Sequence, residues 1–174
     1  VSKDLSVEEF QKFREALLRF PRGRFFAALA TVQYFQALRI SEAAAIHWGD
    51  VRLDFDQSAR SRLFVRRSVL WPRRKGLASF VQMGFKNSKS TDGVKEQPLF
   101  PESFAALQAM AEEAQGLGKE LQGLVFEVDG KHLEYRSIQF VYDRAFKSVG
   151  LPYRGTHVMR HGGCRNIYNE VPDT

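Results

Sequence analysis

Apolar residues at intervals of three and four positions dominate the first fifty residues and predict three helices. The first runs from Ser6 to Pro21, and Ser6 and Glu9 form a capping box at its start. The second is predicted over 24–38, with phenylalanine, leucine and valine side chains on one core face. The third is predicted over 41–48, with the serine at its first position as the N-cap.

The pattern changes after this region to short apolar runs of the kind found in strands. Three such runs lie at 63–65, 80–83 and 94–99, and turn-forming residues separate them at 72–76 and 90–93. The second turn contains an Asp-Gly pair, which is typical of a hairpin tip. These runs predict one small antiparallel sheet of three strands.

Helical spacing returns after Pro101. Helices are predicted over 103–115 and 135–149, and a last helix is expected to begin near Thr156. A short extended piece at 124–126 precedes an Asp-Gly turn. The chain shows no internal repeat and no linker that would divide it. We therefore expect one mainly helical α+β domain over 1–174, with the small three-stranded sheet at its edge.

The composition is that of a globular protein, with 44% apolar and 26% charged residues among 174. No stretch approaches the roughly 20 apolar residues of a membrane span. The single cysteine, Cys164, excludes a disulfide framework and a four-cysteine zinc site, and it favours a reducing cytoplasm. The first residue is Val1, so the chain is expected to be a fragment of a longer protein.

Positive charge is concentrated in one part of the chain. Residues 60–95 contain ten Lys or Arg and one acid, whereas the whole chain carries a net charge of +6. Such a density favours a polyphosphate partner, although a solvated surface is the simpler alternative. The candidate DNA-binding residues are Arg66, Arg67, Arg73, Arg74 and Lys86.

Arg39 stands in an apolar context that amphipathicity does not explain. The sequence Ala-Leu-Arg-Ile-Ser-Glu at 37–42, followed by His-Trp-Gly-Asp-Val at 47–51, resembles the first arginine box of tyrosine recombinases, the phage-integrase family. The sequence Thr-His-Val-Met-Arg-His at 156–161 resembles their second box, and 86–90 resembles their lysine-bearing hairpin. The resemblance covers nearly the whole chain and implies the catalytic-domain fold of that family.

This resemblance implies a site that cuts and rejoins duplex DNA through a 3′-phosphotyrosyl intermediate. Arg39 and Arg160 would clamp the scissile phosphate, because guanidinium groups bond paired non-bridging oxygens. His157 would bond the same phosphate or move a proton, and Lys89 would protonate the leaving 5′ oxygen as general acid. Lys86 is the alternative to Lys89. No cofactor or metal is implied, and the sequence has no cluster of Asp and Glu ligands.

Two further residues have supporting roles in this interpretation. Glu42 would orient Arg39, although the same pair could instead be purely structural. His161 is expected to be hydrogen-bonded near the site rather than on the phosphate.

The chain also departs from the family pattern. The nucleophilic tyrosine, expected some thirty residues beyond the second box, is absent, and so is the N-terminal core-binding domain. Tyr168 lies eight residues after Arg160, about 12 Å along a helix, which is too far for a nucleophile. The pair Gly162-Gly163 is unusual and should weaken the start of the last helix.

We therefore expect this chain to be a monomeric, cytoplasmic piece of a bacterial or phage-encoded enzyme. It should bind DNA without cleaving it, while the complete protein would form a tetramer on DNA. One alternative is a non-catalytic DNA-binding regulator derived from a recombinase. Another is a histidine phosphatase, because Arg-His-Gly occurs at 160–162, although the chain has too few residues after this motif for the second half of such a site.

Overall fold

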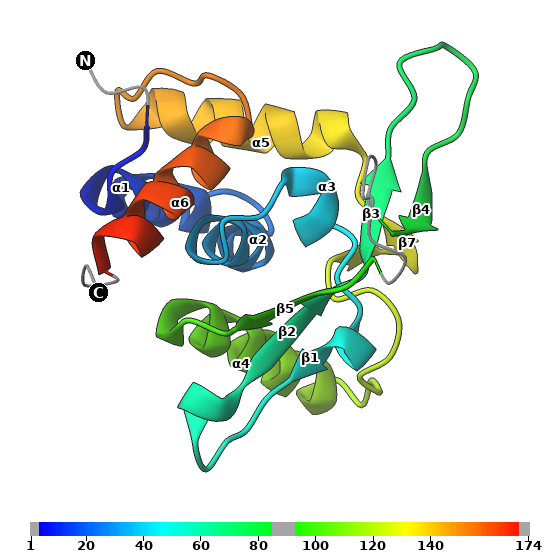
Figure 1. Ribbon diagram of the computed structural model, residues 1–174. Coiled ribbons are helices and arrows are strands. Elements are labelled where there is room, and N and C mark those ends of the chain that lie inside the picture. Colours follow the sequence, from blue (N-terminus) through cyan, green and yellow to red (C-terminus); the bar gives the residue numbers. More distant parts are fainter. Residues whose placement is uncertain (1–3, 85–92, 171–174) are drawn as a thin grey trace.

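The computed structural model describes residues 4–84 and 93–170, and Lys86 and Lys89 lie outside these ranges. The helices surround a central element, α2, and the strands form three small antiparallel sheets (Figure 1). None of the helices in the described ranges combines the length and apolar character that crossing a bilayer requires. The helices are α1 (Val7–Leu18), α2 (Gly23–Phe35), α3 (Ile40–Ala43), α4 (Pro101–Gly116), α5 (Tyr135–Ser148) and α6 (His157–Glu170).

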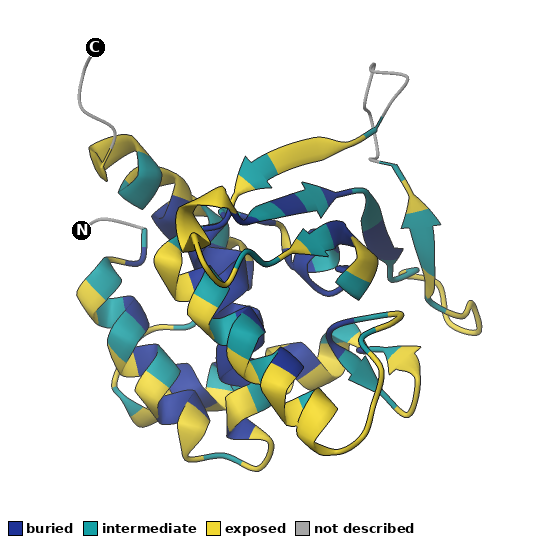
Figure 2. Ribbon diagram, turned by 90° about the horizontal axis from the view of Figure 1, so that it is seen from below, coloured by how far each residue is buried: buried dark blue, intermediate teal, exposed yellow. Residues whose placement is uncertain are grey.

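Helix α2 is the core of the domain. It is buried along almost its whole length, and α1, α4 and α6 pack against it (Figure 2). Aromatic rings fill the space around it: the Phe10 and Tyr34 rings stack with their centroids 4.3 Å apart, and those of Phe13 and Phe146 stack at 4.2 Å. This packing ties α1 to both α2 and α5, so the helical half of the domain is one continuous core.

The predicted start of α1 is confirmed, since the Ser6 hydroxyl oxygen accepts a hydrogen bond from the Glu9 backbone N–H at 3.1 Å. The predicted third helix is wrong in both its start and its length. Helix α3 begins at Ile40 and has four residues, and its N-cap is Arg39 rather than Ser41. The reason is Glu42, whose carboxylate accepts the Arg39 backbone N–H and so places the N-cap two residues earlier than predicted.

The strands pair differently from the predicted three-stranded sheet. Strand β2 (Arg62–Val65) lies between β1 (Val51–Arg52) and β5 (Lys95–Pro98). The run at 80–83 is not in that sheet, because β4 (Phe80–Met83) pairs with β3 (Arg67–Leu70) in a separate hairpin. The fold class is nevertheless as predicted: a mainly helical α+β domain with small antiparallel sheets.

The chain leaves one sheet and enters the next at Arg66, between β2 and β3. Arg66 and Arg67 both contact the buried carboxylate of Asp50 at this point. The β3–β4 hairpin then stands apart from the three-stranded sheet (Figure 1). A sequence pattern that treats each run as one strand cannot show this break.

The ends of the loop that joins β3 to β4 are attached to the segment between β7 and α5. The Trp71 indole N–H donates to the Leu133 carbonyl at 3.0 Å, and the Ser79 hydroxyl donates to Glu134 at 2.8 Å. Strands β6 (Glu127–Val128) and β7 (Lys131–His132) form the third sheet around the predicted Asp-Gly turn. The hairpin is therefore held, where its loop meets its strands, by side-chain contacts that join distant parts of the chain.

The glycine pair in α6 has the opposite effect to the one predicted. Helix α6 is continuous from His157 to Glu170, and both glycines are buried against α2. A Cβ atom at Gly163 would overlap the carbonyl oxygen of Tyr34, and one at Gly162 would overlap that of Leu5. The two glycines therefore allow α6 to approach α2 more closely than any other residue would permit.

Candidate functional site

The guanidinium of Arg39 is fixed by Glu42 where α2 gives way to α3. The Glu42 side chain is only 4% exposed, and its Oε1 accepts from the Arg39 guanidinium at 3.3 Å. Its Oε2 accepts from the Arg39 backbone N–H at 3.1 Å. The Arg39 side chain remains 49% exposed, so a buried carboxylate holds the base of a cation that faces solvent. This arrangement fits the orienting role expected of Glu42.

A buried glutamine that the sequence analysis did not single out attaches the sheet to this junction. The Gln36 side-chain N–H group donates to the Gln97 side-chain oxygen at 3.1 Å and to the Pro98 carbonyl at 3.0 Å. Its oxygen accepts from the Phe100 backbone N–H at 2.9 Å. One side chain therefore binds three positions at and just after β5, namely Gln97, Pro98 and Phe100. The signal in the sequence was a polar residue at the end of an otherwise apolar helix.

Replacing Gln36 by alanine should lower the free energy of unfolding by about 2–3 kcal/mol, because Gln36 is buried and the substitution removes its hydrogen bonds to Gln97, Pro98 and Phe100. Chemical denaturation of both proteins measures this difference. The control is Gln139→Ala on the exposed face of α5, where a change within about 0.5 kcal/mol is expected. Equal stability of the two variants would show that the Gln36 contacts contribute nothing to the fold.

Gln33 attaches the start of α6 to α2 in the same way. Its side-chain N–H group donates to the Thr156 carbonyl at 3.0 Å, and its oxygen accepts from the Tyr142 hydroxyl at 3.4 Å. Gly163, seven residues after Thr156, also lies close to the first box. A Cβ built on it would be 3.2 Å from the Cα of Ala37, and Ala37 precedes Arg39 by two residues. The two segments that resemble the arginine boxes thus lie side by side.

The predicted residues of the second box occupy the first turns of α6. His157 and His161 are exposed, and Arg160 between them is partly buried. His157 shares a face of the helix with the other two, since Arg160 and His161 follow it by three and four residues. That the Arg160 and Arg39 guanidinium groups meet at one phosphate stays a prediction. Tyr168, near the end of the same helix, is 76% exposed.

Lys95 also lies at the Arg39 site, although it was not among the predicted catalytic residues. Its Nζ is 3.8 Å from Glu42 Oε1, the oxygen that Arg39 also contacts. The predicted lysines, Lys89 and its alternative Lys86, fall outside the described residues.

Two of the predicted DNA-binding arginines have a partner within the protein. Arg66 Nε is 3.0 Å from Asp50 Oδ1, and Arg67 pairs with the other oxygen of the same buried carboxylate. Burial and the nearby Arg67 lower the pKa of His47, while Asp50 opposes this change. Asp50, in the second half of the first box, therefore joins this segment to the start of the β3–β4 hairpin.

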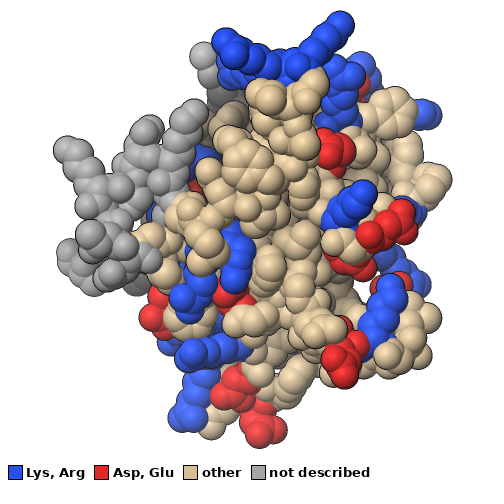
Figure 3. All heavy atoms as spheres, turned by 90° about the vertical axis from the view of Figure 1, so that its right-hand side faces the viewer, with Lys and Arg blue, Asp and Glu red and all other residues tan. Residues whose placement is uncertain are grey.

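Arg73 and Arg74 lie exposed in the loop between β3 and β4, together with Lys75. Figure 3 shows the right-hand side of the molecule in Figure 1, and basic side chains gather at the top of this view, over the loop end of the β3–β4 hairpin. These arginines are thus more exposed than Arg66 and Arg67, which are half-buried.

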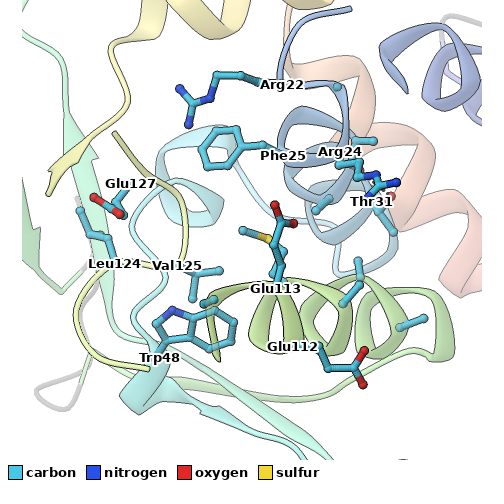
Figure 4. A pocket seen from close by; sticks show the side chains of 18 of the residues that line it. Arg22, Arg24, Phe25, Thr31, Trp48, Glu112, Glu113, Leu124, Val125 and Glu127 are labelled. Carbon is cyan, nitrogen blue, oxygen red and sulfur yellow. Dashed lines mark hydrogen bonds between the residues drawn. The ribbon is translucent and has the colours of Figure 1, made fainter. Parts of the chain in front are cut away.

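A large groove lies elsewhere, between α2 and α4. It has a volume of about 1420 Å³, and the aromatic rings of Phe25 and Trp48 lie in it, with Arg22, Glu112 and Glu113 nearby (Figure 4). Of the predicted site residues that the structure describes, none lines this groove. Within residues 4–84 and 93–170, no three His, Cys, Asp or Glu side chains come close enough together to hold a metal ion.

Comparison with known proteins identifies the fold. No protein-family model and no curated protein matches the sequence. Solved structures do match: the Tn1549 transposon integrase in complex with transposon right end DNA has a TM-score of 0.68 and 20% identity, over 99% of this chain and 56% of that one. The same integrase with circular intermediate DNA gives a TM-score of 0.70 and 18% identity, over 99% and 55%.

A second protein with this fold is the XerH site-specific recombinase bound to its difH substrate. It has a TM-score of 0.63 and 17% identity, over 99% of this chain and 44% of that chain. The chain thus spans about half the length of the structures it matches. Its fold is that of tyrosine recombinase catalytic domains, as the motifs predicted.

Proposed function

We propose that the chain is the catalytic core of a site-specific tyrosine recombinase, which binds duplex DNA and cuts and rejoins its strands. The observation that carries this proposal is the structural match over nearly the whole chain with proteins that were solved on DNA. The position of Arg39 supports it, because this cation is held from behind by a buried carboxylate and faces solvent.

The proposed chemistry follows from where charge develops on the phosphate. A tyrosine oxygen of the complete protein attacks phosphorus, a 3′-phosphotyrosyl bond forms, and the bond to the 5′ oxygen breaks. Negative charge gathers on the two non-bridging oxygens, where Arg39 and Arg160 donate paired hydrogen bonds. His157 donates to the same phosphate, and Lys89 gives its proton to the leaving 5′ oxygen. Glu42 keeps the Arg39 guanidinium in place during the reaction.

Tyr168 is not the proposed nucleophile. It follows Arg160 by eight residues on one unbroken helix, so it lies about 12 Å further along the axis. Covalent capture on a nicked duplex tests the function as a whole. The complete protein should give a protein–DNA band that survives denaturation, and Tyr168→Phe should leave the band unchanged. A complete protein that binds DNA but never gives the band would be a non-catalytic DNA-binding regulator.

The exposed arginines of the β3–β4 loop should contribute to DNA affinity. Changing Arg73 and Arg74 to alanine removes up to two phosphate contacts. The slope of log K against log salt should therefore fall in magnitude by about 1–2, as measured by fluorescence anisotropy with a duplex. Arg66 and Arg67 are left unchanged because Asp50 holds both.

The control for this measurement is the double variant Lys12→Ala, Lys119→Ala, which removes the same net charge from exposed positions outside the hairpin. Its salt slope should stay close to that of the unchanged protein. If both double variants lower the slope equally, the effect reflects net charge alone and the loop makes no DNA contact.

A further inference from the structure

Lys95 and Arg39 share one carboxylate oxygen. Arg39 Nη1 is 3.3 Å and Lys95 Nζ is 3.8 Å from Glu42 Oε1. The two cationic side chains are 49% and 48% exposed, while the carboxylate between them is 4% exposed. The charged ends of both side chains are therefore open to solvent above a buried anion.

The position of Lys95 is set by the fold and does not depend on this ion pair alone. Strand β5 is paired with β2 over four residues, with Lys95 opposite Val65. Lys95 and Gln97 are two apart and so face the same side of the strand, the side on which Gln36 binds Gln97. Glu96 faces the other way, toward Arg62. The strand that carries Lys95 is thus fixed against the α2–α3 junction that carries Arg39.

The cations of Arg39 and Lys95 both lie beside the buried Glu42 carboxylate. Because both nitrogens lie within 4 Å of one oxygen, they are no more than about 8 Å apart, and their attraction for an anion placed between them adds. A phosphate group carries one negative charge in a DNA backbone. The cluster therefore has the charge and the spacing to bind one backbone phosphate through two side chains.

Neutralising the charge of Glu42 is not a sufficient reason for a lysine at position 95. The carboxylate already accepts both the guanidinium and the backbone N–H of Arg39. A separation of 3.8 Å is longer than a hydrogen bond, so the Lys95 ammonium is attracted to Glu42 without using a donor on that oxygen. The ammonium can bond a phosphate oxygen while this ion pair persists.

We propose that Lys95 is a second phosphate-binding residue of the site, which contacts the same DNA phosphate as Arg39. This inference rests on the proposed function and adds to it a residue outside the sequence motifs. It predicts that the affinity for DNA depends on the positive charge at position 95 and that this dependence is coupled to Arg39.

The test is the dissociation constant for a fluorescent duplex at about 100 mM salt. Lys95→Gln and Arg39→Ala should each weaken binding about tenfold, as expected for a hydrogen bond to a charged group. Lys95→Arg should bind like the unchanged protein. The double variant should be weaker than either single one, but by less than the product of their effects, because both side chains act on one phosphate. Lys119→Gln, at an exposed position far along the chain, is the control and should change nothing.

A second comparison separates phosphate binding from neutralisation of Glu42. In a Glu42→Gln background the carboxylate at position 42 is gone, so a lysine that only neutralises it becomes dispensable, whereas a phosphate-binding lysine still contributes. Adding Lys95→Gln to Glu42→Gln should therefore still weaken binding several-fold. Unchanged affinity on that step, or wild-type affinity of Lys95→Gln itself, overturns the inference. If Arg39→Ala also binds like the unchanged protein, the proposed function fails together with it.

Discussion

Replacing Arg39 by alanine in the complete protein should slow the formation of the covalent protein–DNA adduct by about 10²–10³-fold. The side chain is expected to bond the non-bridging oxygens on which charge develops, so its removal raises the barrier to attack on phosphorus. Arg160→Ala should have an effect of the same size for the same reason. The rate of adduct formation on a nicked duplex, at saturating DNA, measures both.

Two controls make this result specific. Arg19→Ala removes an exposed arginine at the end of α1 and should leave the rate unchanged. Arg39→Lys keeps the charge but loses the paired donors, so it should recover only part of the rate. A rate for Arg39→Ala within a factor of three of the unchanged protein would remove Arg39 from the reaction.

Gly163→Ala should be one of the most destabilising single substitutions in the chain. The added Cβ would overlap the Tyr34 carbonyl oxygen, which is backbone in the middle of the core and cannot move aside. Helix α6 would have to shift away from α2, at a cost of about 3 kcal/mol or more. In a domain of this size this corresponds to a fall in the melting temperature of roughly 6–12 °C.

The matched control is Gly116→Ala at the end of α4. No atom lies within 4 Å of a Cβ built there, so the substitution meets no obstacle. It should leave the melting temperature unchanged or raise it slightly, since alanine favours the helix. If Gly163→Ala melts at the same temperature as Gly116→Ala, the close contact between α6 and α2 is not what the glycine provides.

The parts of the fold that depend on neighbouring residues could be predicted from the sequence. Ser6 caps the start of α1 through the Glu9 backbone N–H, and the Asp129-Gly130 pair turns the β6–β7 hairpin with both residues at positive φ. Both features are decided within four residues of chain. The motifs around Arg39 and Arg160 likewise predicted the catalytic-domain fold that the solved structures show.

Apart from the start of α3, which the nearby Glu42 sets, the features that the sequence did not predict depend on contacts between distant residues. The division of the strands between two sheets coincides with the contacts of Asp50 to Arg66 and Arg67, where β2 ends and β3 begins. The role of Gly163 depends on Tyr34, which is 129 positions earlier in the chain. Gln36 and Lys95 join the site only because β5 lies beside the α2–α3 junction. A local pattern carries no information about these partners.

The most direct test of the central claim is a structure of this chain bound to duplex DNA, in which the distances from the Arg39 and Arg160 guanidinium nitrogens to phosphate oxygens are measured. We expect both side chains to lie about 3 Å from the non-bridging oxygens of one and the same phosphate. A complex in which the two guanidinium groups bind different phosphates, or face opposite sides of the domain, would contradict it.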